Sequence, residues 1–352
     1  MSQVLIFTHD TASALTDILQ ASPRSAFILA DSNTAAIART LQSRCPALAD
    51  APVIVIEAGD SNKTLAAVEH VWQKLVDFGA TRRSVLVNIG GGMVTDLGGF
   101  AAATFKRGIS WINVPTTLLG AVDAAVGGKT GINFAGLKNE IGVFAEAAQV
   151  VISTEFFGTL PAAEVASGYA EMLKHALLSG PEALDRALEF DLRKPDLKAL
   201  LPLLEESVEV KRRIVAEDPH EHGIRRALNL GHTIGHAIES LMMERGTPVP
   251  HGHAVAWGLV GALVISYRRS GFPSDTLHRV ADYVYANYPA MPVRCTDYER
   301  LIALMRHDKK NPTPDAISFT LLETSGAPVP GQTTTPEEIQ ISLDLTRDLL
   351  RV

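Results

Sequence analysis

The sequence predicts two domains: an α/β N-terminal domain with a Rossmann-like parallel sheet, then a mostly α-helical C-terminal domain. Over the first part of the chain, short β-branched apolar runs alternate with helical patterns. After Pro161, long stretches rich in Leu, Ala and Glu dominate. The length of 352 residues is sufficient for two domains. We expect the domains to cover residues 1–157 and 158–352.

Six apolar segments of the first domain are predicted strands, and they indicate a parallel sheet covered by helices on both faces. The helical spacing of apolar residues in Thr64–Phe78 is typical of the helices between them. The predicted strands are Val4–Phe7, Ala26–Asp31, Val53–Glu57, Ser84–Ile89, Trp111–Val114 and Val150–Ser153.

The second domain is predicted to contain at least four long helices and one strand. A turn at Pro312–Asp315 is expected before the strand Ile317–Leu322. The predicted helices are Ala162–Leu178, Lys198–Glu217, Thr233–Glu244 and Ala254–Arg269.

Composition excludes several classes of protein. A hydrophobic content of 46% indicates a globular chain, and a net charge of −7 without a basic run argues against a nucleic-acid partner. Cys45 and Cys295 alone form neither a disulfide framework nor a thiolate zinc site. No leader-like N-terminus and no run of about 18 apolar residues is present, so we expect a cytoplasmic protein without a membrane partner.

Polar residues and glycines follow several predicted strands. Gly90–Gly92 connect a strand to a helix, where backbone N–H groups can bind phosphate, although a plain tight turn is an alternative. The spacing is not Gly-x-Gly-x-x-Gly, so the standard dinucleotide fingerprint is absent. Asp31–Asn33, Asp60 with Lys63, and Pro115–Thr117 follow other strands. Each could be a cap or turn, but together at one sheet edge they favour a dinucleotide.

A second glycine-rich segment contains lysines. Gly127–Thr130 is similar to a P-loop, but Asp123 stands where the Walker pattern requires glycine, which argues against a triphosphatase. Lysines beside glycines, here Lys129 and Lys138, are typical of anion sites. A surface loop with solvated lysines is the alternative.

Histidines and a glutamate indicate a metal site in the second domain. His232 and His236 are four residues apart and would share a helix face, and His251 and His253 follow. A solvated helical pair is the alternative. Glu171 lies in a nearly uncharged helix, so we expect it to be buried and to need a cation. One glutamate and two histidines are a ligand set of catalytic zinc sites.

Basic residues also gather in the second domain. Their charge suits a substrate with both a carboxylate and a phosphate. They are Lys211, Arg212, Arg213, Arg225 and Arg226.

From about Ala26 to Leu322 the motifs resemble those of the 3-dehydroquinate synthase family, in the sugar phosphate cyclase superfamily. The resemblance implies a dehydroquinate synthase-like fold. The motifs are Gly90–Phe100, Arg107-Gly108, Val114–Leu119, Val122–Asn133, Lys138–Gly142, Gly168–Lys174, Leu228–Glu239, His251-Gly252 and Asp308–Asn311.

The resemblance implies a reaction of the shikimate pathway to aromatic amino acids. Members of the family convert 3-deoxy-D-arabino-heptulosonate 7-phosphate (DAHP) to 3-dehydroquinate and phosphate. They use NAD⁺ in a transient oxidation, followed by phosphate elimination, reduction and an intramolecular aldol step. The implied cofactors are NAD⁺ and a divalent metal, Zn²⁺ or alternatively Co²⁺.

The resemblance also implies roles for individual residues. Glu171, His232 and His251 would bind the metal. The expected NAD contacts are Asp31, Asn33, Asp60, Lys63, Gly91, Gly92, Asp96, Thr116, Thr117, Lys129, Lys138 and Thr159. The expected catalytic and substrate-binding residues are Asp123, Lys129, Asn139, Lys174, Lys211, Arg225, Asn229, His236 and Lys309. Arg107 is expected to reach the site of a neighbouring subunit, which implies a homodimer.

The chain departs from the family pattern at a few positions. His253 stands where Glu is usual, which leaves open a competing metal ligand, and Asp60 stands where Glu is usual in the NAD loop. His175 is expected to be a packed helical residue. The segment between His236 and His251 is about two residues longer than usual.

Three other functions are compatible with parts of the pattern. A sister cyclase would form a valiolone- or inosose-type ring from a substrate without a carboxylate. A metal-dependent NAD alcohol or glycerol dehydrogenase would share Gly90–Asp96 but lack the Gly127–Asn139 loop. A non-catalytic pseudoenzyme should have lost a residue such as Glu171, and the implied ligands and lysines are all present.

Overall fold

The computed structural model describes residues 3–22, 24–135, 137–306 and 316–352. The chain forms two compact units. The first comprises Met1–Leu160 and Leu197–Val208, and the second Pro161–Asp196 and Glu209–Val352. The fold class predicted from the sequence is confirmed, whereas the division at residues 157/158 stays a prediction.

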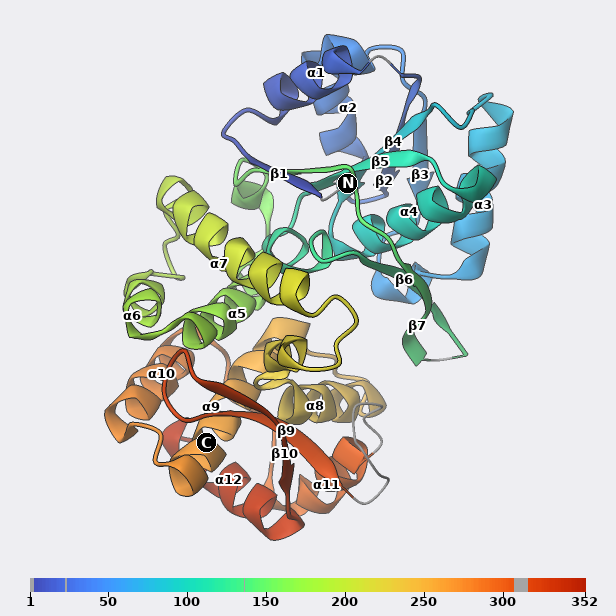
Figure 1. Cartoon of the computed structure of the whole chain (residues 1–352). Helices are drawn as coiled ribbons and strands as arrows, with labels where there is room; N and C mark the ends of the chain where they lie inside the picture. The colour runs from blue at the N-terminus through green and yellow to red at the C-terminus, as the bar shows by residue number, and fades with distance from the viewer. Residues whose placement is uncertain (1–2, 23, 136, 307–315) are drawn as a thin grey trace. The chain divides into compact units, whose positions relative to one another are not determined.

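A six-stranded parallel sheet forms the centre of the first unit (Figure 1). Its strand order is β1-β8-β5-β4-β2-β3. β4 is buried along its whole length, as expected for a strand covered on both faces. The strands are β1 (Val4–Phe7), β2 (Ala26–Asp31), β3 (Val53–Ile56), β4 (Val85–Gly90), β5 (Ser110–Pro115) and β8 (Gln149–Ile152).

Four α-helices flank this sheet, with α1 packed against α2 and α3 packed against α4. Gly98 allows α4 to approach β4, because a Cβ there would lie 2.2 Å from Asn88 Oδ1. The helices are α1 (Thr11–Ala21), α2 (Ala35–Arg44), α3 (Leu65–Asp77) and α4 (Gly92–Thr104). The short helices are η1 (Pro46–Leu48), η2 (Asp60–Asn62), η3 (Phe105–Arg107), η4 (Gly120–Ala124) and η5 (Phe157–Thr159).

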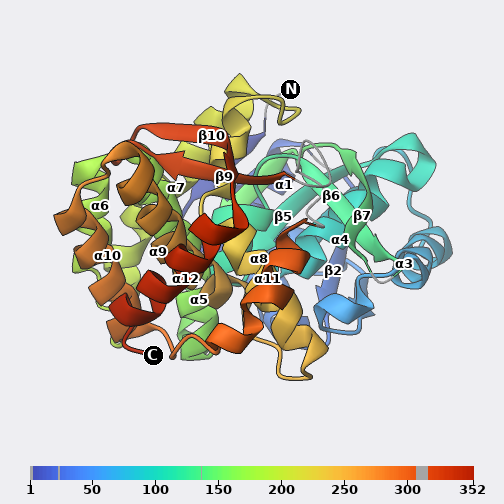
Figure 2. The same ribbon diagram turned by 90° about the horizontal axis from the view of Figure 1, so that it is seen from below.

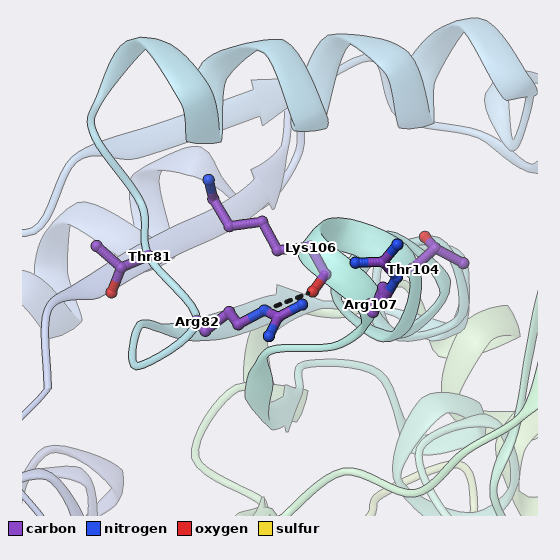
Figure 3. Close-up of a pocket in the computed structure, with 5 residues that line it drawn as sticks. All are labelled: Thr81, Arg82, Thr104, Lys106 and Arg107. Carbon is purple, nitrogen blue, oxygen red and sulfur yellow. Dashed lines mark hydrogen bonds between the residues drawn. The ribbon is translucent and has the colours of Figure 1, made fainter.

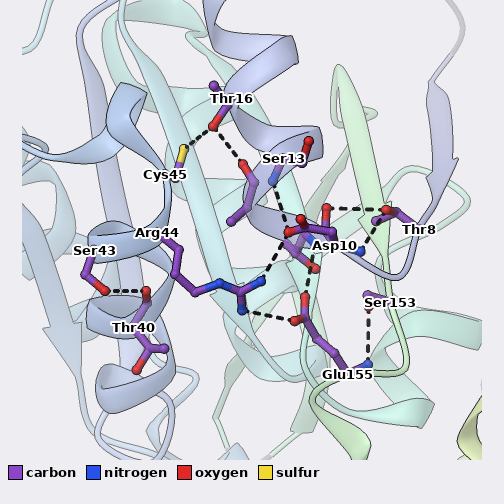
Figure 4. Close-up of polar contacts among 12 residues, drawn as sticks. Thr8, Asp10, Ser13, Thr16, Thr40, Ser43, Arg44, Cys45, Ser153 and Glu155 are labelled. Carbon is purple, nitrogen blue, oxygen red and sulfur yellow. Dashed lines mark hydrogen bonds and ion pairs between the residues drawn. The ribbon is translucent and has the colours of Figure 1, made fainter.

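A polar cluster joins α1, α2 and the segment after β8 (Figure 4). Arg44 contacts Asp10 Oδ1 at 3.1 Å and Glu155 Oε2 at 3.2 Å. Asp10 caps α1 through the backbone N–H of Ser13, and Glu155 accepts the N–H of Thr11. The start of α1 is therefore satisfied by two carboxylates that Arg44 neutralises.

Part of the predicted anion loop is a β-hairpin. β6 (Lys129–Phe134) and β7 (Leu137–Phe144) pair antiparallel. Gly131 and Gly142 allow close approach, since a Cβ on Gly142 would lie 2.2 Å from Thr130 O. Lys129 and Lys138 are exposed, as in the alternative of a surface loop with solvated lysines, so their role in binding an anion stays a prediction.

The second unit is mainly helical (Figure 2). α9 packs against α5, α8, α10 and α12. β9 (Ile317–Leu322) and β10 (Pro328–Thr334) form an antiparallel pair. The helices are α5 (Ala162–Ser179), α6 (Pro181–Glu189), α7 (Leu197–Glu217, which begins in the first unit), α8 (His232–Glu244), α9 (His251–Ser270), α10 (Ser274–Asn287), α11 (Tyr298–Arg306) and α12 (Pro336–Leu349), with short helices η6 (Ile224–Asn229) and η7 (Cys295–Asp297).

Candidate active site

Residues expected to contact NAD lie at the carboxyl edge of the parallel sheet. β2, β4 and β5 are adjacent and in register, so Asp31, which ends β2, lies at the same edge as Gly91 and Thr116, which follow β4 and β5. Asp31 is buried, and its Oδ1 accepts the backbone N–H groups of Asn33 at 3.0 Å and Thr34 at 2.8 Å. This edge is where open α/β sheets bind ligands.

The glycine turn after β4 begins helix α4. Gly91 is the N-cap, with an extended backbone, and Gly92 is the first helical residue. A Cβ on Gly120 would lie 3.1 Å from Gly92 N, so the turn packs closely against η4, which contains Asp123. The turn therefore needs small residues, and the helix N-terminus supplies N–H groups and a positive dipole end at the sheet edge.

Lys63 is a buried cation near this edge. Its Nζ lies 2.5 Å from Asp96 Oδ2 and 2.5 Å from Asn139 Oδ1, and the residue is 2% exposed. Lys138 Nζ lies 3.6 Å from Asp60 Oδ2. Burial of an ammonium group requires such partners. The structure thus brings together five of the expected cofactor and substrate residues.

Other expected residues of the first unit are more exposed. Lys129 begins β6 with an exposed side chain, and Thr117 Oγ1 accepts the N–H of Gly120. Thr159 is exposed and donates to Phe156 O at 2.9 Å.

Arg107 projects from a left-handed turn at the end of α4. Lys106 and Arg107 have φ of 49° and 67°, which costs energy for residues other than glycine. Arg82 Nε donates to Lys106 O at 3.2 Å and stabilises this turn (Figure 3). Arg82, Lys106 and Arg107 line an open pocket with Thr81 and Thr104. Strained, exposed cationic residues are typical of binding sites rather than of packing.

The second unit gathers the predicted metal ligands. Glu171 Oε1 lies 3.4 Å from His232 Nε2 and 3.6 Å from His251 Nε2. One nitrogen each of His232, His236 and His251 lies within 4.8 Å of the other two. Glu171 comes from α5, His232 and His236 from α8, and His251 from α9.

Glycines bring these three helices together. Gly252 follows His251, and a Cβ there would lie 1.8 Å from Ser167 O on α5. Gly231 precedes His232 with φ of 78°, and a Cβ there would lie 2.8 Å from Leu259 N on α9. The glycines next to His251 and His232 therefore allow close packing of the helix backbones, which places both histidines at the contacts between helices.

The cluster fits a divalent cation. Glu171 is 0% exposed, and its Oε1 has no hydrogen-bond partner. Leaving a buried carboxylate oxygen unsatisfied is costly, and a cation facing Oε1 and the two Nε2 atoms would satisfy it. His232 Nδ1 lies 3.1 Å from Leu230 O, and His251 Nδ1 lies 3.0 Å from Glu239 Oε2. Both rings thus direct Nε2 toward Glu171.

The charged groups of the cluster shift the pKa values of one another. Burial raises the pKa of Glu171, but Lys174 and His232 outweigh it and hold this pKa well below its usual value. Burial and the nearby Lys174 lower the pKa of His232, which favours the neutral ligand form. Burial lowers the pKa of His251, but the nearby carboxylates of Glu171 and Glu239 outweigh burial and raise it to about 10. A histidine binds a metal ion in its neutral form, so the metal competes with a proton at His251.

Several predicted substrate residues of this unit are at least partly buried. Lys174 pairs with Glu171 and is 2% exposed. Arg225 is 4% exposed and donates to Pro219 O at 2.5 Å, while Lys211 is 7% exposed. Asn229 Nδ2 donates to Glu221 Oε1 at 3.3 Å. Lys309, with the rest of Asp308–Asn311, lies outside the described residues.

His253 does not belong to the histidine cluster. It is buried, its Nε2 lies 3.1 Å from Ala163 O, and its ring packs against Trp257 and Tyr288. This contact gives no support to the hypothesis that His253 competes for the metal. His175 is fully buried in α5, as a packed helical residue should be.

Two residues in the quoted motifs were given no role from sequence. Glu239 is three residues after His236 and seven after His232, so all three share one face of α8, a spacing that could have identified it. Asn133 ends the Val122–Asn133 motif and contacts Asp60, 73 residues earlier in sequence. No sequence signal shows that contact.

No helix within the described parts of the chain is long and apolar enough to cross a membrane.

Solved structures define the class to which this fold belongs. A 2-deoxy-scyllo-inosose synthase, solved with carbaglucose-6-phosphate, NAD⁺ and Co²⁺, aligns with a TM-score of 0.83 at 24% identity, over 96% of this chain and 95% of that one. The 2-epi-5-epi-valiolone synthase of Streptomyces hygroscopicus, solved with NAD⁺ and Zn²⁺, aligns at 0.82 with 25% identity, over 99% and 97%. The fold is that of the sugar phosphate cyclases.

Sequence comparison identifies the family within this class. Residues 53–167 match the 3-dehydroquinate synthase N-terminal domain and residues 168–311 its C-terminal domain. A 3-dehydroquinate synthase of Parabacteroides distasonis is 49% identical over 98% of both chains, and one of Staphylococcus carnosus is 36% identical over 92% of this chain and 90% of its own. The chain belongs to the 3-dehydroquinate synthase family.

Proposed function

We propose that this chain catalyses the 3-dehydroquinate synthase reaction, the conversion of DAHP to 3-dehydroquinate and phosphate. This makes it a phosphate-eliminating carbon–oxygen lyase with NAD⁺ and a divalent metal, Zn²⁺ or Co²⁺, as cofactors. Its place is the second step of the shikimate pathway.

One observation carries the proposal beyond family membership. The buried Oε1 of Glu171 faces Nε2 of both His232 and His251, and it has no hydrogen-bond partner. The three residues implied by the family resemblance thus converge although they come from three helices. When bound, NAD⁺ supplies a reversible hydride acceptor and the divalent cation supplies a Lewis acid.

The residues of the second unit would bind substrate and move a proton. Arg225, held by Pro219 O, and Asn229 would bind the substrate carboxylate. Lys174 would bind the phosphate. An imidazole nitrogen of His236 would accept the proton from C6, next to the transient ketone at C5, with the substrate's own phosphate as the alternative base.

The residues of the first unit would bind the cofactor and the phosphate. Asp31 and the Gly91–Gly92 turn would hold the ribose and pyrophosphate at the sheet edge. Lys129 and Asn139 would contribute to phosphate binding, and Arg107 would do so from the neighbouring copy of a homodimer. We place the activity in the cytoplasm.

The alternatives are less well supported. The aligned cyclases of the inosose and valiolone type are 24–25% identical to this chain, far below the 49% of the dehydroquinate synthase relative. A glycerol dehydrogenase of Sinorhizobium meliloti aligns with a TM-score of 0.64 at 15% identity, which indicates a shared fold alone.

The direct test is phosphate release from DAHP by the purified protein with NAD⁺, before and after treatment with EDTA. We expect release that needs both NAD⁺ and metal, with 3-dehydroquinate formed in equal amount. A folded protein with both cofactors bound that released no phosphate from DAHP would refute the proposal. Sedoheptulose 7-phosphate and glucose 6-phosphate would then test the sister activities.

A further inference from the structure

Asn133 connects two segments that both contain candidate ligand-binding residues. Its Nδ2 donates to Asp60 O at 2.8 Å and lies 3.4 Å from Asp60 Oδ2. Its Oδ1 accepts the backbone N–H of Asn139 at 3.0 Å, and its own backbone N–H donates to Lys63 O at 2.8 Å. Both polar atoms of the side chain are therefore used, one toward each segment.

These contacts close a ring of hydrogen bonds, which we call the Asn133 ring: Asn133, Lys63 and Asn139. The third side of the ring is the 2.5 Å contact between Lys63 Nζ and Asn139 Oδ1. Asp96 Oδ2, at 2.5 Å from the same Nζ, neutralises the buried ammonium group. Because each member contacts both others, displacement of one removes a protein partner from each of the other two, and the buried Lys63 ammonium group loses most by it.

The hairpin backbone is irregular where the ring forms. The β6–β7 register shifts between Ile132 and Phe134, so Asn133 lies at the irregularity. A shift of this kind redirects a residue out of the regular ladder, which is consistent with the Asn133 N–H donating to Lys63 O. Asn139 has φ of 53°, a left-handed conformation that asparagine tolerates better than most residues.

We propose that Asn133 is a positioning residue that holds Lys63 and Asp60 for NAD⁺ binding and fixes Asn139 beside them. Its two contacts have separate effects: the Nδ2 donor holds the Asp60 loop, and the Oδ1 acceptor holds Asn139. The inference rests on the proposed function, because it takes these residues as NAD⁺ and phosphate ligands.

The experiment is NAD⁺ binding to the full-length protein by isothermal titration calorimetry, using wild type, Asn133→Ala and Asn133→Asp. Asn133→Ala removes both contacts. Asn133→Asp keeps the acceptor for Asn139 but removes the donor and adds a carboxylate beside Asp60. We expect the Kd for NAD⁺ to rise about 2- to 10-fold in both, the change that loss of one hydrogen bond typically produces.

Hydrogen exchange of the 137–144 segment distinguishes the two contacts. The Asn139 amide should exchange faster in Asn133→Ala and stay protected in Asn133→Asp, a difference that general destabilisation would not produce. Asn287→Ala is the matched control, because Asn287 Nδ2 donates to Tyr283 O at 2.9 Å in the second unit. Its loss should change neither the Kd for NAD⁺ nor the exchange rate of the Asn139 amide.

The outcomes separate this inference from the proposed function. Asn133 variants that bind NAD⁺ as tightly as wild type would overturn the positioning role and leave the enzyme activity standing. If Asn133→Ala does not fold, the Kd of the isosteric Asn133→Asp for NAD⁺ is by itself the test of the positioning role. A folded wild-type protein that binds no NAD⁺ would overturn the proposed function and this inference with it.

Discussion

At the scale of single residues, Glu239 shows how a carboxylate outside the ligand set can control a metal site. Its Oε2 lies 3.0 Å from His251 Nδ1, on the side of the ring opposite Glu171. Such a contact fixes the tautomer and orients Nε2. Glu239→Gln keeps the shape and removes the charge, so we expect metal affinity to fall about 10- to 100-fold.

Competition with a chromogenic chelator would measure this change. Glu244→Gln is a suitable control, since Glu244 lies on the same helix but is exposed and pairs with Arg300. Equal affinities of the Glu239 and Glu244 variants would contradict the orienting role.

His236 and His251 should separate metal binding from proton transfer. Both lie in the histidine cluster, with ring centroids 5.6 Å apart, so position alone permits either as a ligand. If His236 is the base, His236→Ala should keep its metal and lose about 10²- to 10⁴-fold in kcat. His251→Ala and Glu171→Gln should lose the metal itself.

Metal content after dialysis, measured by atomic absorption, distinguishes these variants, and near-UV circular dichroism verifies folding. Loss of metal from His236→Ala would make His236 a ligand instead of a base.

At this scale, the sequence predicted which residues have a chemical role better than it predicted which residues contact one another. Glu171, His232 and His251 could be named from residue type and family motifs, and they converge in the structure. Glu239 and Asn133 lie in the same motifs, but their partners are fixed by helix packing and by a hairpin irregularity. The spacing of residues in the sequence shows which side chains share a helix face. It does not show which distant segment of the chain a helix or a strand will contact.

At the scale of elements, one ion pair joins α9 to α12. Arg269 Nε and Nη2 donate to Glu338 at 2.7 and 2.5 Å, and Glu338 also accepts the N–H of Thr335 in a capping box. The bond from Arg269 is the main cause that lowers the pKa of Glu338 to about 2. A lowered carboxyl pKa stabilises the fold above the usual value of 4.5, and this contribution is lost as pH falls toward 2.

We therefore expect Glu338→Gln to lose about 1 kcal/mol of unfolding free energy near neutral pH. Urea unfolding at several pH values would show the variant approaching wild type as pH falls from 4.5 toward 2. The exposed Glu337→Gln, one residue away, serves as control. A constant difference at all pH values would contradict the assignment.

The elements also show why some structure was predictable. β1, at one edge of the sheet, and β2, inside it, match their predicted bounds because each is an apolar run that no polar residue interrupts. The β6–β7 hairpin was not predicted as strands, since β7 is largely exposed and both strands contain glycine. Its pairing depends on Gly131 and Gly142 meeting across the hairpin, which strand propensity does not show.

At the scale of the whole molecule, Arg107 links function to assembly. It lies in a left-handed turn at the surface of the first unit, stabilised by Arg82 through Lys106 O. If it serves the site of a neighbouring copy, each site in a homodimer combines one copy's metal cluster with the other's arginine. The two-fold symmetry of such a dimer makes both sites alike.

Mixing two inactive variants tests this directly. Arg107→Ala keeps the metal cluster, and His251→Ala keeps the arginine, so a hybrid dimer has one complete site and one that lacks both groups. Subunits mixed in equal amounts and allowed to exchange form half hybrids, so we expect about a quarter of wild-type activity. If Arg107 acts within its own subunit, neither site of a hybrid is complete and activity stays absent. Each variant alone is the control, and the exchange itself is verified by mass spectrometry of differently tagged copies.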